Sequence, residues 1–167
     1  MEKLPFFFYG TLRPGERNYE QLLKGRTRRE ENGWWLEGAE LYLHAVSSYQ
    51  HLKPGVTTYQ PSGSYPYMTE GKGRVAGHLV ELKPELYDTL LTELDWLEGY
   101  SEGAPDEESE YLRIVREVVH ENGARCQTWV YLGAPHAFAR EAPYLSRIES
   151  GDWLAWRNSH SNTNETD

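Results

Sequence analysis

The chain has 167 residues and carries 17 Lys and Arg against 26 Asp and Glu, a formal net charge of −9. That length predicts one compact domain. The acidic excess argues against binding to nucleic acid or to a membrane surface, because both need a basic face on the protein. Hydrophobic residues make up 38% of the chain and include 12 Tyr, 6 Trp and 4 Phe, so we expect a folded core rich in aromatic rings.

The single cysteine, Cys126, can form neither an internal disulfide nor the cysteine pair of a zinc site, which fits a reducing compartment. No histidine pair has the spacing of a helical zinc motif, so we expect no metal ion and a packed, unreactive Cys126. No stretch approaches the roughly 18 apolar residues of a membrane-spanning helix, and the N-terminal apolar run is too short for a signal peptide. We therefore expect a cytoplasmic protein.

Along the chain, the first predicted unit is a strand, a loop and a short helix. Residues 4–9 form an apolar, aromatic run that is typical of a fully buried strand, and residues 10–15 read GTLRPG, which predicts a turn-rich loop. Asn18 is expected to cap the following helix with Gln21 at capping-box spacing, and Gly25 is expected to end it.

The rest of the pattern combines several strands with few helices. Residues 36–46 and 73–82 are typical of strands, and residues 111–119 and 124–132 flank Asn122-Gly123, a strong hairpin signal. Residues 84–98 predict the clearest helix, with a proline in the first turn and leucines at helical spacing. This pattern predicts an α+β fold with a curled or barrel-like sheet. The domain is expected to span residues 1–157, because residues 158–167 contain no apolar side chain and predict a disordered tail.

Glu98 is the most informative residue of the predicted helix. Positions 87, 91, 94 and 98 share one helical stripe, which is apolar except for Glu98. If this stripe faces the core, burial raises the pKa of Glu98, and its place at the negative end of the helix, beside Gly99, acts in the same direction. Such a carboxylate can accept and release a proton near neutral pH.

A second interpretation of this helix is open. The leucines at 86, 90, 94 and 97 also share a face, and if that face is the buried one, Glu98 lies on its solvated edge. Asp95 could form an acid–base pair with Glu98, but it lies off the apolar stripe, which favours a solvated position.

The order of the motifs resembles that of a known family. Residues 8–15 read FYGTLRPG and residues 94–100 read LDWLEGY, as in the γ-glutamylcyclotransferase-like (AIG2-like) family. Three further blocks follow in the family order: Tyr65-Pro66 with GKGRVAG at 71–77, YLR at 111–113, and IESGDW at 148–153. The resemblance covers roughly residues 6–156.

The resemblance implies a small mixed β-barrel flanked by a few helices, and an enzyme that uses neither a metal nor an organic cofactor. Members act on small γ-glutamyl amides: the α-amine of the substrate attacks its own γ-carbonyl, and 5-oxoproline and a free amine are released. By motif position the catalytic glutamate corresponds to Glu98. The substrate-binding loop corresponds to Tyr9, Gly10, Thr11 and Leu12. Further candidates for the lining of the substrate cavity are Tyr111, Arg113 and Tyr131.

The residue types suit this chemistry. The α-ammonium must lose a proton before it attacks, and the departing amine must gain one, so a single carboxylate such as Glu98 can serve both steps. Backbone N–H groups of a glycine-containing loop can bind the substrate carboxylate and the developing oxyanion. Ring closure is intramolecular, so holding the substrate in its folded form supplies much of the acceleration.

Each of these features also has an ordinary structural interpretation. The loop at 9–15 is equally typical of a plain strand-to-helix turn, and Tyr111, Arg113 and Tyr131 are also ordinary strand residues. The alternative function is a non-catalytic module of the same fold that binds a metabolite or a partner protein. A carboxylate at position 98, on an apolar stripe, argues against that alternative, because a pocket without catalysis does not need it.

Residues 102–110, called the acidic loop below, carry five carboxylates and no basic residue. The five are Glu102, Asp106, Glu107, Glu108 and Glu110. The acidic loop is expected either to be a solvated surface turn or to lie beside the site entrance, where its negative field would favour a cationic leaving group.

Overall fold

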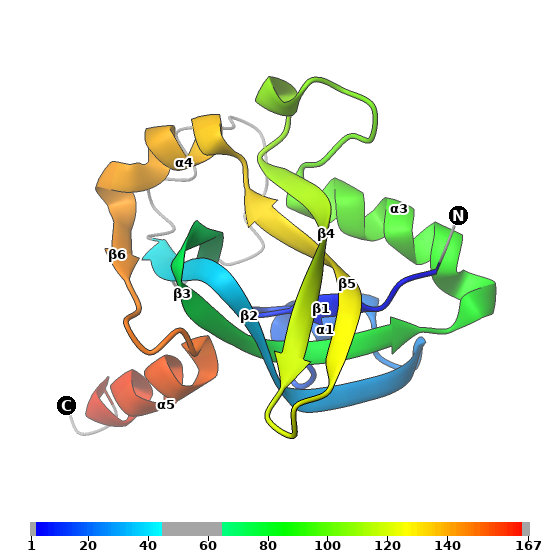
Figure 1. The fold of residues 1–167 in the computed structure, drawn as a ribbon, viewed down its shortest axis with the longest axis horizontal. Helices are drawn as coiled ribbons and strands as arrows, with labels where there is room; N and C mark the ends of the chain where they lie inside the picture. The colour runs from blue at the N-terminus through cyan, green and yellow to red at the C-terminus, as the bar shows by residue number, and fades with distance from the viewer. Residues whose placement is uncertain (1–2, 45–64, 165–167) are drawn as a thin grey trace.

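The computed structural model describes residues 3–44 and 65–164. In this part of the chain, a closed β-barrel is surrounded by four α-helices (Figure 1). The barrel strands follow the order β3-β1-β5-β4-β2, and the barrel closes because β2 also pairs with β3. β1 is parallel to β5, and the other strand pairs of the described sheet are antiparallel. The expected α+β fold with a small mixed barrel is therefore confirmed.

The described residues form the following elements. The strands are β1 (Phe6–Phe8), β2 (Thr27–His44), β3 (Tyr65–Leu82), β4 (Tyr111–His120), β5 (Arg125–Gly133) and the short β6 (Leu145–Arg147), which extends the sheet beside β2. The α-helices are α1 (Arg17–Leu22), α3 (Tyr87–Glu98), α4 (Pro135–Glu141) and α5 (Trp153–Asn164). Short 3-10 helices cover Pro84–Leu86, Asp106–Glu108 and Ala142–Tyr144.

Strands β2 and β3 are longer than the sequence predicts. The expected strands start at residues 36 and 73, whereas β2 starts at Thr27 and β3 at Tyr65. Residues 45–46, the end of the first predicted strand, lie outside the described residues. The unpredicted start of β2, residues 27–33, reads TRREENG, and these residue types have little preference for strands. Its pairing with β3 in the closed barrel overrides that preference.

Helix α1 begins differently from the sequence prediction. Its N-cap is Glu16, which makes no side-chain capping bond, so the predicted cap at Asn18 is wrong. Asn18 lies inside the first turn, and its side-chain amide donates a hydrogen bond of 2.7 Å to the hydroxyl of Thr11. A contact with the preceding loop therefore replaces the predicted capping box. The chain turns after the helix at Gly25, which has a φ of 80°.

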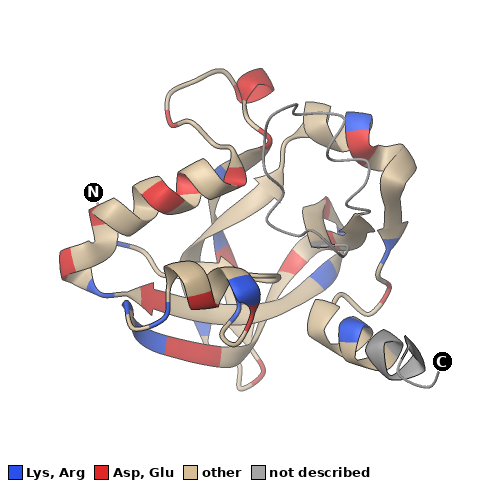
Figure 2. Cartoon of the chain, turned by 180° about the vertical axis from the view of Figure 1, so that it is seen from behind, with Lys and Arg blue, Asp and Glu red and all other residues tan. Residues whose placement is uncertain are grey.

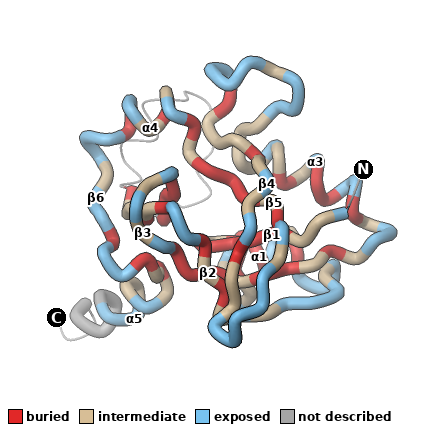
Figure 3. Tube along the Cα trace, viewed as in Figure 1, coloured by how far each residue is buried: buried red, intermediate tan, exposed pale blue. Residues whose placement is uncertain are grey.

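Two hydrophobic clusters lie on either side of β1. One contains Phe7 and joins side chains from all the barrel strands, reaching Trp153 at the start of α5. The other contains Phe6 and Phe8 and packs against helices α1 and α3. β1 is buried on both faces because alternate side chains of a strand point to opposite sides. Figure 3 shows the acidic loop and the β4–β5 hairpin as exposed segments around this buried centre.

The last helix, α5, runs into the segment for which the sequence predicts a disordered tail, since its backbone is helical up to Asn164. Its first turns are anchored: Asp152 accepts a hydrogen bond from the backbone N–H of Ala155 (3.3 Å), Trp153 is buried, and Arg157 pairs with Glu16. An anchored first turn lets a polar helix continue, because nucleation is the costly step. Among the described residues, no helix has the length and apolar character needed to cross a membrane.

Candidate active site

Helix α3 turns the predicted apolar stripe toward the protein. Tyr87, Leu91 and Leu94 are buried, and Glu98 continues their stripe at the end of the helix. Gly99 follows in the left-handed conformation, with a φ of 69°, and ends the helix there. Leu90 and Leu94 of the alternative face are also buried, and Leu86 and Leu97 are partly buried against the same cluster. The buried side of α3 therefore includes both stripes, and Glu98 lies half-buried at the end of one of them.

Glu98 is a half-buried carboxylate. None of the hydrogen bonds or ion pairs found within residues 3–44 and 65–164 uses it. Burial raises the pKa of Glu98 from its ordinary 4.5 to about 8, and the negative charge of Asp95, one helical turn earlier, acts in the same direction. Near neutral pH this group can therefore exist with or without its proton, as an acid–base catalyst requires.

Asp95 is not solvated, contrary to the sequence prediction. Its side chain is only 14% exposed, and one carboxylate oxygen accepts hydrogen bonds from the hydroxyl of Tyr131 (2.7 Å) and from Nε of Arg113 (2.9 Å). Arg113 and Tyr131 lie directly opposite each other on β4 and β5, so both reach the same carboxylate. Helical periodicity cannot reveal these partners, because they come from another part of the chain. The network anchors the last turn of α3 to the barrel wall.

Arg113 is almost fully buried, with a side-chain exposure of 2%. Besides Asp95, its guanidinium contacts Glu102 of the acidic loop at 3.3 Å and lies 4.3 Å above the ring of Trp129. The charge of Arg113 is thus balanced by two carboxylates. This residue connects α3, the barrel and the acidic loop.

The loop after β1 is tightly packed. A Cβ atom at Gly10 would lie 2.4 Å from Cγ of Pro66, so a residue larger than glycine does not fit at this position unless Pro66 moves. The N–H of Arg13 donates to the carbonyl of Gly10 (3.0 Å) and closes a turn, while Tyr9 and Leu12 are buried. No hydrogen bond between described residues uses the backbone N–H groups of Thr11 or Leu12. These two donors therefore have no acceptor in the described part of the chain.

Two sets of contacts relate the candidate residues to helix α3. Leu12 shares a hydrophobic cluster with Leu94 of the stripe and with Tyr131 of β5. The N–H of Glu110 donates to the carbonyl of Gly99 (3.0 Å), which places Tyr111 beside the end of the helix. Loop 9–12 thus belongs to the same cluster as helix α3, and the start of β4 adjoins the end of that helix.

Sequence reasoning missed the role of Arg13, the next residue of the loop motif. Its side chain is 2% exposed and donates hydrogen bonds to Nδ1 of His78 (2.9 Å), to Asn32 (3.2 Å) and to Asp152 (3.4 Å). Burial and the nearby charge of Arg13 lower the pKa of His78 to about 4, so the neutral imidazole can accept this bond. Arg13 ties the site loop to β2, β3 and the start of α5.

We expect Arg13→Met to lower the free energy of unfolding by about 2 kcal/mol or more, because three acceptors lose their donor and two of them come from the barrel wall. Urea denaturation measures the change. Arg17→Met is the control, since Arg17 is exposed on α1 and should change the free energy by less than about 0.5 kcal/mol. Equal losses in the two variants would contradict the role given to Arg13.

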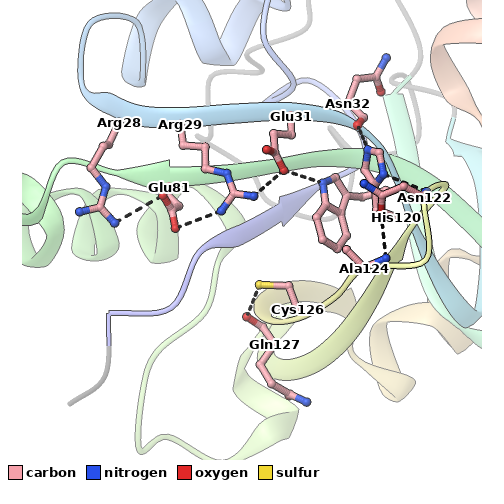
Figure 4. Close-up of polar contacts among 11 residues, drawn as sticks. Arg28, Arg29, Glu31, Asn32, Glu81, His120, Asn122, Ala124, Cys126 and Gln127 are labelled. Atoms are coloured by element: carbon pink, nitrogen blue, oxygen red, sulfur yellow. Dashed lines mark hydrogen bonds and ion pairs between the residues drawn. The ribbon is translucent and has the colours of Figure 1, made fainter.

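A separate polar cluster surrounds the β4–β5 hairpin, at the end of the barrel away from the acidic loop (Figures 1 and 4). Asn122 accepts a bond from the N–H of Ala124 (2.8 Å), so the predicted hairpin is confirmed. Cys126 is half-buried and packs against the barrel cluster, and burial raises the pKa of its thiol. Within the described part of the chain, no group of His, Cys, Asp and Glu residues is arranged to hold a metal ion.

Folding neutralises part of the acidic loop. Glu102 pairs with Arg113, and Glu110 pairs with Arg140 of α4, although the loop itself contains no basic residue. The exposed 3-10 turn Asp106–Glu108 carries the remaining three carboxylates, which form no ion pair with the described residues (Figure 2). The negative field of the loop therefore comes from this turn.

Comparison with known proteins relates the chain to one family and one fold. The sequence pattern of the family described as gamma-glutamyl cyclotransferase, AIG2-like, matches residues 6–155. A comparison with curated protein sequences found no match. An AIG2-like protein from mouse has a similar structure, with 22% identity, coverage of 89% of this chain and 88% of that chain, and a TM-score of 0.54.

Two other solved structures have the same fold. An uncharacterized protein from Pyrococcus horikoshii has 20% identity, covers 95% of this chain and 97% of its own, and has a TM-score of 0.51. A structure named gamma-glutamyl cyclotransferase has 17% identity, with coverage of 79% and 67% and a TM-score of 0.50. At these identities the structural similarities show the fold alone.

Proposed function

Because this chain belongs to the gamma-glutamyl cyclotransferase, AIG2-like family, we propose that it is a cofactor-free γ-glutamyl cyclotransferase that converts a γ-glutamyl amide into 5-oxoproline and a free amine. The observation that carries the proposal is Glu98, a half-buried carboxylate with a pKa of about 8 and no partner among the described residues. A carboxylate of this kind suits a reaction in which one group must first take up and then return a proton.

In the proposed mechanism, Glu98 takes a proton from the α-ammonium of the substrate. The α-amine nitrogen then forms a bond to the γ-carbonyl carbon, and the bond between that carbon and the leaving nitrogen breaks as Glu98 returns the proton to the leaving amine. Glu98 next accepts the extra proton that the attacking nitrogen still carries and passes it to the released amine, which leaves as its ammonium form. The products are 5-oxoproline and the amine. Ring closure is intramolecular, so the main task of the site is to hold the glutamyl part in its folded form.

The loop after β1 is proposed to bind the anionic parts of the substrate. The N–H groups of Thr11 and Leu12 can donate to the α-carboxylate or to the oxygen that becomes negative during the attack. The nearby arginines are already engaged, since Arg13 bonds to Asp152 and Arg113 bonds to Asp95 and Glu102. Backbone donors are therefore the groups that remain for this purpose.

The proposal is tested by incubating the purified protein with γ-glutamyl-alanine, γ-glutamyl-propylamine, γ-glutamyl-putrescine and ε-(γ-glutamyl)-lysine, and measuring 5-oxoproline by mass spectrometry. We expect release from at least one amide. Binding of the same amides is measured by calorimetry. Binding without 5-oxoproline would favour the alternative of a non-catalytic binding module. The absence of both binding and turnover would contradict the proposal.

We also propose that the acidic loop favours a cationic leaving group. Replacing its unpaired carboxylates by Asp106→Asn, Glu107→Gln and Glu108→Gln should raise KM for γ-glutamyl-putrescine more than for γ-glutamyl-propylamine and leave kcat nearly unchanged. The difference should shrink at high salt, because the Debye length is about 8 Å at physiological ionic strength. The ratio of kcat/KM between the two amides is compared in the wild type and the triple variant at low and high salt. If it is the same in all four measurements, the acidic loop is only a solvated surface turn.

A further inference from the structure

Tyr67, near the start of β3, is a buried phenol whose hydroxyl has no hydrogen-bond partner among the residues that the structure describes. The residue is 3% exposed, and its oxygen bonds to none of the described residues. Most buried polar side-chain atoms in proteins do have a partner, and leaving one unpaired costs about 1–3 kcal/mol. An unpaired hydroxyl beside a candidate active site is explained if a ligand supplies the missing acceptor.

Contacts place this hydroxyl at the same end of the barrel as Glu98. The ring of Tyr67 packs against that of Tyr111, with centroids 5.3 Å apart. Its hydroxyl fills the room left by Gly133, where a Cβ atom would lie 2.3 Å from the phenolic oxygen. Gly133 is directly opposite Tyr111 on the β4–β5 pair, and the residue before Tyr111 bonds to Gly99. Tyr67 thus packs directly against Tyr111, the residue that lies beside the end of α3.

The charges around Tyr67 indicate which part of a substrate it can bind. Burial raises the pKa of Tyr67, and the carboxylates of Glu110 and Glu141 raise it further, while Arg140 opposes them. The hydroxyl therefore stays protonated and donates. Two neighbouring carboxylates disfavour the α-carboxylate of the substrate at this position. A neutral acceptor on the leaving-amine side of the scissile amide fits better.

We propose that Tyr67 is a further substrate-binding residue, whose hydroxyl donates a hydrogen bond to a neutral oxygen of the leaving amine. The inference rests on the proposed function, since it names the part of that substrate which lies away from the glutamyl group. It assigns the leaving amine to a class that carries a carbonyl or hydroxyl oxygen close to the amide nitrogen. Any positive charge that the acidic loop attracts would lie further along the same group.

The test compares two amides of nearly equal shape, γ-glutamyl-glycinamide and γ-glutamyl-isobutylamine, of which only the first has a carbonyl beyond the scissile amide. We expect the protein to prefer the glycinamide by about tenfold in kcat/KM, chiefly through KM, which is the size of one neutral hydrogen bond. Tyr67→Phe keeps the ring and should remove the preference. The matched control is Tyr87→Phe, because the Tyr87 hydroxyl donates to the carbonyl of Leu4 (2.7 Å), away from the site, and this variant should retain the preference.

Thermal melting accompanies these measurements, and Tyr67→Phe should melt at the same or a higher temperature, because it removes an unpaired buried hydroxyl. An unchanged preference for the glycinamide in Tyr67→Phe would overturn the inference. If Tyr67→Phe fails to fold, Gly133→Ala provides the second measurement, since its methyl group must displace the phenol and should also reduce the preference.

A binding measurement separates this inference from the proposed function. Calorimetry with the same two amides is repeated in a Glu98→Gln background with and without Tyr67→Phe. Loss of the affinity difference on removing the hydroxyl supports the role of Tyr67, even if the protein releases no 5-oxoproline and the proposed reaction is wrong. If the two amides bind with equal affinity in the Glu98→Gln background and the wild-type protein turns over normally, the role of Tyr67 is rejected while the proposed function stands.

Discussion

Glu98→Gln is expected to lower kcat by about 100-fold or more while leaving the affinity for a γ-glutamyl amide largely intact. The amide has the shape of the carboxylate but cannot accept a proton, and loss of a general base typically costs ~10²-fold or more. Glu98 forms no hydrogen bond or ion pair with the described residues, so the substitution breaks no such contact in this part of the fold. Steady-state kinetics with the best amide of the panel, together with calorimetric binding, measures the two effects separately.

Glu93→Gln is the matched control for this prediction. Glu93 lies on the same helix, but it faces Arg26 at the surface, with which it forms an ion pair of 3.5 Å. The same chemical change at this position should leave kcat within about twofold, because it touches no group of the site. A Glu98→Gln protein that keeps more than about a tenth of the wild-type kcat would rule out Glu98 as the essential base.

The second large effect is a difference in the free energy of unfolding between Glu98→Gln and the wild-type protein, and this difference grows with pH. Glu98 has a pKa of about 8 in the folded protein and an ordinary value of 4.5, so between these pH values the folded state holds a proton that the unfolded state has released. Stability from this group therefore falls as pH rises from about 4.5 to about 8. At pH 8 and above, the loss is on the order of 4 kcal/mol. Glutamine does not titrate, so Glu98→Gln should be similar to the wild-type protein near pH 4.5 and more stable near pH 8.

Urea denaturation at pH 5, 6.5 and 8 measures this difference. Other groups also contribute to the wild-type curve: the lowered pKa of His78, about 4, makes stability rise with pH between that value and its ordinary 6.5. The comparison between variants removes this contribution, because His78 is the same in both. Glu93→Gln should follow the wild-type protein at every pH. A constant difference between wild type and Glu98→Gln across the three pH values would show that the Glu98 pKa is not raised.

The elements that the sequence predicts correctly are those with a local signal. β1 is a run of aromatic residues, the β4–β5 hairpin has Asn122-Gly123 at its turn, and α3 has apolar residues at helical spacing. Each pattern acts between residues close in the chain, so neighbouring side chains are enough to reveal it. The same holds for Glu98, whose place at the end of an apolar stripe and beside Gly99 is visible without any structure.

Only the tertiary structure decided which side chains and strands from distant parts of the chain become partners. Asp95 lies off the stripe and reads as solvated, yet closure of the barrel brings Arg113 and Tyr131 to it. The sequence predicts Asn18 as a helix cap, yet its side-chain amide donates a hydrogen bond to the hydroxyl of Thr11 in the packed loop. The charged start of β2 has no strand signal in the sequence, but pairing with β3 makes it a strand.

The candidate site divides in the same way. The sequence by itself determined the family, and its short motifs supplied the residues that we propose as base and binding loop, because such motifs consist of residues close together in the chain. It did not indicate Tyr67, whose importance depends on the room left by Gly133 on another strand and on Tyr111 beside it. Periodicity reports which side of an element faces inward, but not which side chain of another element it meets there. That choice follows from the order and register in which the barrel strands close.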